Sequence, residues 1–165
     1  MKHFTLFTAA MAMAFGVQAQ INDGSFEGSG WNEASFLFGT PLCTVAECGN
    51  CGGPCVPRTG QRYAWFGGSG SPDEVASVDQ DATIPNGSSA NVVMYVKIPH
   101  GGDGTAANTF IVYVDGNNVG TLTALDTAQY VDYTLWSVNV SAYADGGVHN
   151  IKLEGSENGG NTISQ

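Results

Sequence analysis

Short segments of this chain alternate apolar and polar residues, and clusters of turn-forming residues separate them. Residues 91–98 show the pattern most clearly. One face of that segment carries the apolar side chains Val92, Met94, Val96 and Ile98. Because successive side chains of a strand point to opposite faces, Tyr95 is predicted to face away from these apolar residues. The same alternation predicts further strands over residues 31–38, 61–66, 74–84, 109–114, 119–124, 133–140 and 148–153.

Helical periodicity is nearly absent, and only residues 125–129 are expected to form a short helical turn. Residues 115–118, Asp-Gly-Asn-Asn, form a strong hairpin-turn signal between two predicted strands. Eight or nine short strands, each apolar on one face, are typical of two sheets packed face to face. The sequence therefore predicts an all-β fold, a two-layer antiparallel β-sandwich of the jelly-roll type.

The first nineteen residues differ from the rest of the chain. Lys2 and His3 precede an apolar run over residues 4–16, and Val17-Gln18-Ala19 provides small residues for cleavage. This is the pattern of a secretory signal peptide, with a buried N-terminal helix as the alternative. We therefore expect residues 1–19 to be a signal peptide, residues 20–165 to be the β-sandwich module, and the protein to be secreted or surface-located. No membrane insertion is expected, because the apolar run is too short to span a bilayer.

The net negative charge of the chain restricts the kinds of ligand that it can bind. After removal of the signal peptide, four basic residues remain against 15 acidic ones, which gives a net charge of −11. Such a chain disfavours nucleic acid and anionic lipid, because phosphate binding needs Lys and Arg. It tolerates uncharged sugars and divalent cations, although acidity also simply favours solubility.

Several motifs, taken in order, resemble the galactose-binding-like jelly-roll domain of carbohydrate-binding modules in secreted bacterial proteins. They are Asp-Gly-Ser-Phe-Glu at 23–27 followed by Trp31, and then residues 63–68, 78–85, 110–116, 141–147 and 149–153. The resemblance covers nearly all of the mature chain and concerns the fold more than the ligand.

The resemblance also implies a structural calcium ion that links the first strand to the last. Glu27 and Asp23 stand where the ligands from the first strand would be. Members of the family close with a further strand that carries paired Asp residues, whereas this sequence stops at Gln165. We therefore expect the final strand to be missing and the chain to be part of a longer polypeptide.

Four cysteines, Cys43, Cys48, Cys51 and Cys55, lie within thirteen residues. In an exported protein, close and even-numbered cysteines favour disulfides, and Cys43–Cys48 with Cys51–Cys55 is the expected pairing because it joins sequential neighbours. A Cys₄ zinc site is the second interpretation, although the spacings are crowded for it. An iron–sulfur cluster is the third, and both export and the early fourth cysteine disfavour it.

Aromatic residues are the candidate ligand-binding residues. Tyr95 and Tyr113 are predicted to face outward from two strands, and we expect them to share an exposed patch. Tyr63, Trp65 and Trp31 would extend it. Flat rings with hydrogen-bond donors nearby suit the apolar faces and polar edges of sugars. The alternative is that these rings only pack against loops.

Catalytic motifs are absent: the sequence has no G-x-S-x-G, no H-E-x-x-H and no P-loop. His149 shares a predicted face with Ile151 and Leu153, which favours a half-buried structural role. The sequence therefore predicts a non-catalytic secreted module that binds neutral polysaccharide or a cell-surface glycan. A structural or adhesive module without a glycan ligand is the alternative, and a glycosidase is the third hypothesis.

Overall fold

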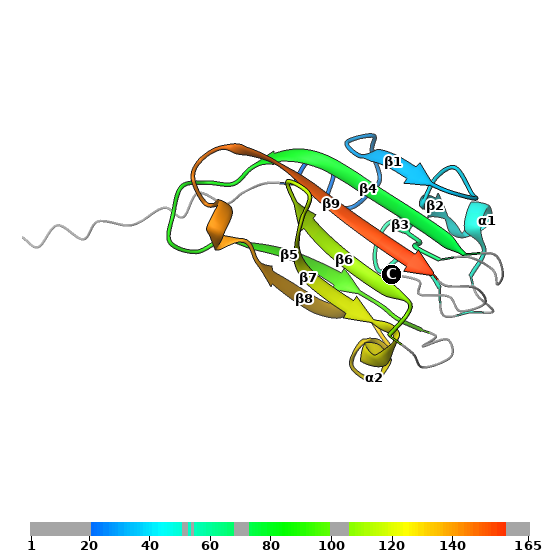
Figure 1. Ribbon diagram of the computed structural model, residues 1–165. Helices are drawn as coiled ribbons and strands as arrows, with labels where there is room; N and C mark the ends of the chain where they lie inside the picture. Colours follow the sequence, from blue (N-terminus) through cyan, green and yellow to red (C-terminus); the bar gives the residue numbers. More distant parts are fainter. Residues whose placement is uncertain (1–20, 51–52, 54, 68–72, 100–105, 158–165) are drawn as a thin grey trace, which may run out of the picture.

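The computed structural model describes residues 21–50, 53, 55–67, 73–99 and 106–157, so the predicted signal peptide and the chain beyond Glu157 lie outside the described residues. Its largest element is a five-stranded antiparallel sheet in the order β1-β4-β9-β6-β7 (Figure 1). The strands of this sheet are β1 (Asn32–Ser35), β4 (Glu74–Thr83), β9 (Val148–Glu157), β6 (Thr109–Val114) and β7 (Asn117–Thr123).

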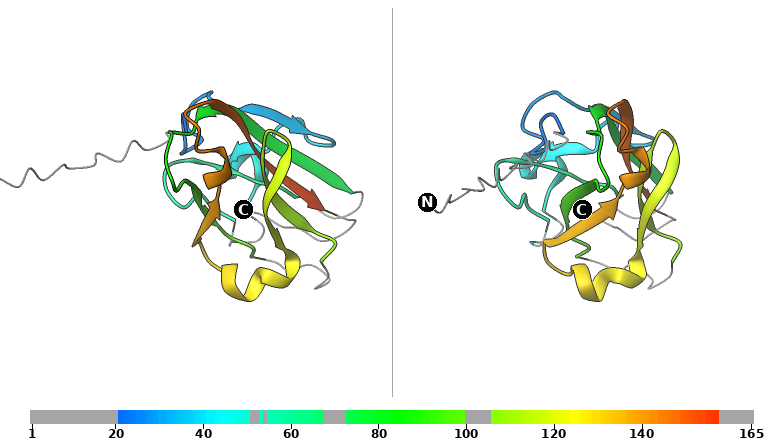
Figure 2. Two further views of the ribbon diagram at one scale, coloured as in Figure 1. Left: turned by 60° about the vertical axis from the view of Figure 1, so that its left-hand side comes forward. Right: turned by 90° about the vertical axis from the view of Figure 1, so that its left-hand side faces the viewer.

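Two small antiparallel sheets complete the strands of the described residues. One pairs β2 (Leu42–Thr44) with β3 (Arg62–Ala64), and the other pairs β5 (Asn91–Val96) with β8 (Thr134–Asn139). Side chains of both small sheets join a core on one face of the main sheet. The two views of Figure 2 show β5 and β8 separated from β1, β2 and β3, which lie toward the other side of the molecule. The structure is therefore predominantly β with antiparallel sheets.

Within the described residues, helical structure is limited to single turns. They are α1 (Val45–Cys48), η1 (Ala124–Asp126), α2 (Thr127–Tyr130) and η2 (Ser141–Tyr143). The predicted turn over 125–129 is confirmed by η1 and α2, whereas α1 was not predicted. Among the described residues, no helix is long and apolar enough to span a membrane.

The central strand pair shows why the alternating pattern produces this sheet. β4 and β9 pair over ten residues, from Glu74 opposite Glu157 to Thr83 opposite Val148. Along β4 every second residue is buried, and β6 and β9 show the same alternation. The predicted buried face of residues 74–84 is confirmed, because its members Ala76, Val78, Gln80, Ala82 and Ile84 are all buried.

The aromatic ring of Phe110 on β6 connects the parts of this core. It is 2% exposed, and its ring centroid lies 5.4 Å from that of Phe66 and 5.8 Å from that of Trp136. Phe66 follows β3, and Trp136 lies on β8. Phe110 therefore joins the main sheet to both small sheets, and burial of such a large ring favours their association.

Each predicted strand corresponds to an observed strand, but most of the observed strands begin or end at different residues from those predicted. The largest differences are at β9, which was predicted over residues 148–153 and extends to Glu157, and at β1, which was predicted over residues 31–38 and ends at Ser35. Phe36, Leu37 and Phe38 are exposed beyond β1. The N–H groups of Phe36 and Leu37 donate to the buried carboxylate of Glu74, and that of Phe38 donates to Ser35 Oγ. β2 was not predicted, because three residues are too few to show a period of two.

The cysteine segment contains the expected Cys43–Cys48 disulfide, with its Cα atoms 6.0 Å apart. Cys55 is disulfide-bonded as well, and Cys51 lies outside the described residues. Cys43 and Cys55 are buried with Tyr63 in a small cluster separate from the main core. The disulfide interpretation of Cys43 and Cys48 is therefore confirmed over the zinc and iron–sulfur alternatives.

His149 joins two loops at one end of the main sheet. Its Nδ1 lies 2.8 Å from Asp115 Oδ2, and its Nε2 lies 3.0 Å from Asp145 Oδ1. The imidazole is buried and packs edge-on against Tyr143. The hydrogen bonds to Asp115 and Asp145 raise the pKa of His149, and the bond from His149 lowers the pKa of Asp115. The pKa of Asp145 is lowered by the backbone N–H of Gly147 and, to a smaller extent, by His149. The predicted structural role of His149 agrees with these contacts.

This cluster predicts how stability depends on pH. A histidine whose folded-state pKa is raised stabilises the fold fully below about pH 6.5 and loses that contribution as pH rises through the folded value. The two carboxylates contribute above about pH 4 and lose their contribution as pH falls. We expect the wild-type melting temperature to drop by several degrees more than that of His149→Gln between pH 5.5 and 8.5. Parallel pH profiles of the two proteins in differential scanning calorimetry would contradict this assignment.

A candidate ligand groove between two strand edges

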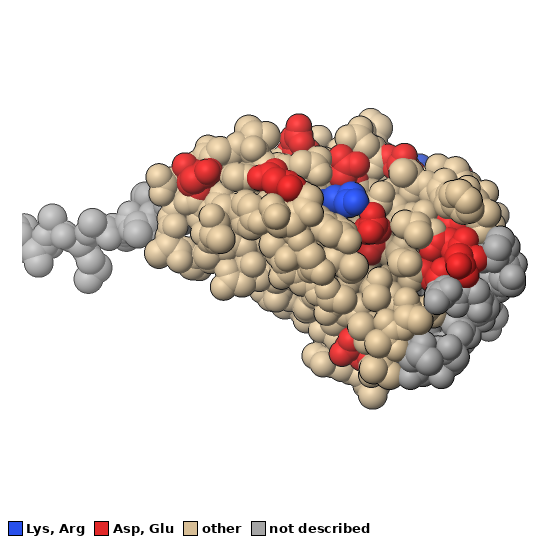
Figure 3. Space-filling model, viewed as in Figure 1, with Lys and Arg blue, Asp and Glu red and all other residues tan. Residues whose placement is uncertain are grey.

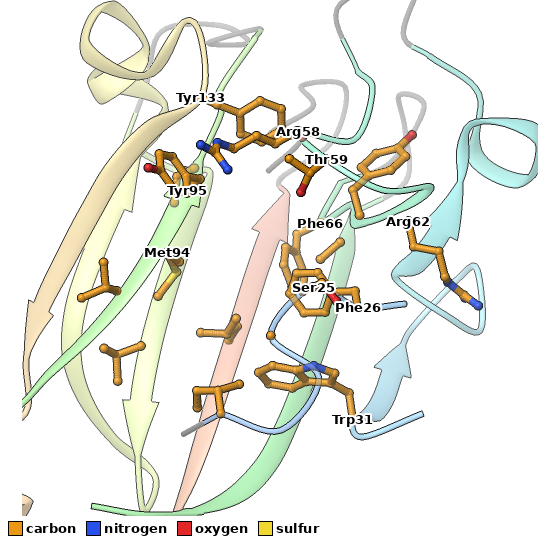
Figure 4. A pocket seen from close by; sticks show the side chains of 18 of the residues that line it. Ser25, Phe26, Trp31, Arg58, Thr59, Arg62, Phe66, Met94, Tyr95 and Tyr133 are labelled. Atoms are coloured by element: carbon orange, nitrogen blue, oxygen red, sulfur yellow. The ribbon is translucent and has the colours of Figure 1, made fainter. Parts of the chain in front are cut away.

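A cavity of about 360 Å³ lies between β5 on one side and β3 with the N-terminal segment on the other (Figure 4). Its residues come from parts of the chain that are distant in sequence and that the strand pairing brings together. Those used below are Phe26, Trp31, Arg58, Arg62, Tyr63, Ala64, Phe66, Val93, Tyr95, Phe110, Tyr133, Ile151 and Leu153. We refer to this cavity as the groove.

The floor of the groove is the buried face of the main sheet. Phe110 of β6 and Ile151 and Leu153 of β9 contribute its apolar surface. Phe66 covers one end of the floor, above Gly155 of β9, where any side chain would collide with its ring. Glycine at this position in β9 therefore lets the segment after β3 approach the sheet closely.

The N-terminal segment forms one wall. Phe26 and Trp31 pack with ring centroids 5.3 Å apart, and Trp31 Nε1 donates to the carbonyl oxygen of Asp23 at 2.9 Å. Glu27 attaches this wall to β3, since its Oε1 accepts hydrogen bonds from the backbone N–H groups of Gln61 at 2.7 Å and of Arg62 at 2.9 Å. These two bonds lower the pKa of Glu27.

Both strands beside the groove have one edge that no described strand pairs with. In an antiparallel ladder, alternate residues direct their N–H and C=O groups to the partner strand. Val140 N donates to Ala90 O, so the even-numbered residues of β5 face β8, and Val93 and Tyr95 direct their backbone groups to the free edge. On β3, Trp65 N donates to Pro41 O, so Ala64 faces away from β2.

The mouth of the groove is aromatic and cationic. Tyr95 is 45% exposed, and the guanidinium carbon of Arg58 lies 3.5 Å from its ring centroid. Figure 4 shows Arg58 between Tyr95 and Tyr133. Tyr133 donates from its hydroxyl to Val56 O at 2.8 Å, which ties the loop that carries Arg58 to the start of β8. Burial raises the pKa of Tyr133 to about 12, so this hydroxyl stays protonated.

Two of the predicted ligand-binding residues, Tyr95 and Tyr63, line the groove. The expectation that Tyr95 and Tyr113 share one patch is wrong, because β5 pairs with β8 whereas β6 belongs to the main sheet. Tyr113 lies instead beside Glu154 on the outer face of the main sheet, with its hydroxyl 3.3 Å from that carboxylate. Trp65 lines a separate cavity of about 520 Å³ next to the Cys43–Cys48 disulfide.

Asp23 and Glu27, the predicted calcium ligands, already accept hydrogen bonds from the backbone. Asp23 Oδ2 accepts from Gly28 N at 2.8 Å, and Glu27 accepts from β3. No group of three or more His, Cys, Asp and Glu residues suited to a metal ion occurs among the described residues. Calcium takes six to eight oxygen ligands. The described residues therefore do not form a calcium site by themselves.

Arg58, Tyr133 and Phe26 are groove residues that were not predicted. Phe26 belongs to the motif at 23–27, which gave the only sequence signal for any of them. Arg58 lies in a loop without periodicity, and its place depends on a hydrogen bond between residues 77 positions apart. Comparison with protein-family models, curated protein sequences and solved structures finds no match to this chain.

Proposed function

We propose that this protein is a secreted, non-catalytic module that binds carbohydrate in the groove between β5 and β3. The observation that carries the proposal is the combination, in one cavity, of an apolar floor, aromatic walls and two strand edges with which no described strand pairs. A sugar ring has apolar C–H faces and hydroxyl groups at its edges. Apolar walls bordered by free N–H and C=O groups complement both parts of such a ring.

The arrangement of the sheets supports a two-layer jelly roll of the galactose-binding-like kind as the finer description of the fold. The five-stranded sheet would form one layer, and the two small sheets would form the other. In this description the groove is a gap in the second layer, where the backbone edges of β5 and β3 remain accessible. Export through the N-terminal signal would deliver the module to extracellular or surface glycans.

The proposal predicts that Tyr95→Ala weakens retention on glycans. Loss of the Tyr95 ring removes a partly exposed aromatic surface at the mouth, and we expect about a tenfold loss of affinity. Affinity electrophoresis and pull-down on cellulose, chitin, xylan and pectin would measure it. Tyr113→Ala is the matched control, because Tyr113 lies on the outer face of the main sheet, and its retention should equal that of the wild type.

If Tyr113→Ala loses as much affinity for glycans as Tyr95→Ala does, the ligand binds outside the groove and the proposed site is wrong. No retention of the wild type on any glycan would favour a structural or adhesive module. The free edges of β5 and β3 support that second candidate, since an extended peptide pairs with such edges by strand addition. Concentration-dependent association without glycan retention would be its signature.

A further inference from the structure

The four basic side chains of the described residues differ in their partners. Lys97, Lys152 and Arg62 each contact an acidic or carbonyl oxygen. The acceptors are Asp132 at 3.1 Å, Glu154 at 2.7 Å and the carbonyl oxygen of Leu42 at 2.8 Å, respectively. Arg58 forms no ion pair with any described residue. It is exposed at the mouth of the groove, with its guanidinium over the ring of Tyr95.

The groove differs in charge from the rest of the surface. The chain has 15 Asp and Glu residues, and acidic side chains are spread over the face in Figure 3. None of the described residues that line the groove is acidic. Of its two basic residues, Arg62 donates to the carbonyl oxygen of Leu42, and Figure 4 shows its side chain directed away from the cavity. In a chain of net charge −10, Arg58 thus places a positive charge at the mouth of the groove.

Two contacts fix the position of the exposed Arg58 side chain. Tyr133 anchors the loop that carries Arg58 by its hydrogen bond to Val56, and the guanidinium lies over the ring of Tyr95. Stacking on an aromatic ring leaves the N–H groups in the plane of the guanidinium free to donate. A planar carboxylate accepts two parallel N–H bonds from such a group, with both charge and geometry matched.

Resting on the carbohydrate-binding function proposed above, we propose that the groove selects glycans that carry a carboxylate, such as uronic acids, and that Arg58 binds this group. The net charge of the chain alone predicts a neutral sugar. However, surface charges are screened over about 8 Å in physiological salt, whereas a carboxylate in the groove is in direct contact with Arg58. Local charge therefore decides selectivity at this site.

Polygalacturonate and its fully methyl-esterified form test this, because they share a backbone and differ in the carboxylate. In 0.15 M salt with EDTA, we expect wild-type protein to bind the acid form about tenfold more tightly than the ester. Arg58→Gln should remove this preference, and Arg58→Lys should retain part of it. Lys152→Gln removes one positive charge from the outer face of the main sheet and should keep the preference.

The outcomes separate the two proposals. Equal wild-type affinity for both polymers overturns carboxylate selection and leaves carbohydrate binding intact. Binding of neither polymer, nor of any other glycan, overturns carbohydrate binding itself. Equal loss of preference in Lys152→Gln would show a general charge effect and overturn the assignment to Arg58. Equally tight binding of poly-glutamate would show that the groove recognises a peptide chain and overturn selection of a sugar.

Discussion

Replacement of Phe110 by Ala is expected to lower the free energy of unfolding by about 3–5 kcal/mol, as large-to-small changes of buried aromatic residues do. Phe110 is 2% exposed and touches rings on both small sheets. Its loss leaves a cavity between the main sheet, β8 and the segment that follows β3. Because domains have only about 5–15 kcal/mol of stability, the variant should be partly unfolded at 37 °C.

Urea unfolding followed by tryptophan fluorescence would measure this change. Phe36→Ala is the matched control, since the same side chain is 79% exposed there, and its effect should stay within about 0.5 kcal/mol. A midpoint for Phe110→Ala close to that of Phe36→Ala would show that Phe110 is not a central core residue.

Replacement of Glu74 by Ala is expected to lower the free energy of unfolding by about 2–3 kcal/mol, because Leu37 N and Ser35 Oγ lose their buried acceptor, whereas Phe36 N keeps Val75 O at 3.0 Å. Glu74 is 1% exposed at the start of β4. Its carboxylate accepts hydrogen bonds from Ser35 Oγ at 2.5 Å, from Phe36 N at 3.0 Å and from Leu37 N at 2.9 Å. One buried side chain thereby ends β1 and fixes the exposed segment that follows it.

Hydrogen exchange would locate the effect. The amide of Leu37 should lose protection in Glu74→Ala, whereas that of Phe36 keeps its bond to Val75 O, and the amides of β9 next to β6 should change only as much as the global stability does. Asp81→Ala is the control, since Asp81 is an exposed carboxylate on the same strand. Unchanged protection of Leu37 would exclude the proposed role of Glu74.

The alternating pattern was sufficient to predict which face of each strand is buried, because that property depends on neighbours two residues apart. The faces of β4, β5 and β6 follow the sequence directly. The partner of each strand does not follow from its own pattern, and this is why Tyr95 and Tyr113 were wrongly placed together. Pairing depends on long-range contacts such as β4 with β9, which join residues about 70 positions apart.

The candidate site was predictable only in part. Tyr95 and Tyr63 carry a strand signal and were found, whereas Arg58 lies in a loop and was not. A loop position is set by tertiary contacts, here the hydrogen bond from Tyr133 to Val56. The same limit applies to Glu27, whose hydrogen bonds to the backbone N–H groups at the start of β3 were not predicted.

Mapping a bound oligosaccharide by two-dimensional NMR tests the groove most directly. On titration with an oligogalacturonide, the amides of Val93, Tyr95 and Ala64 should shift together, because their backbone groups face the groove from both edges. The amide chemical shifts of β6 residues whose side chains lie on the outer face, including Tyr113, should not change. Shifts confined to that outer face, or none at saturating ligand, would contradict a carbohydrate site between β5 and β3.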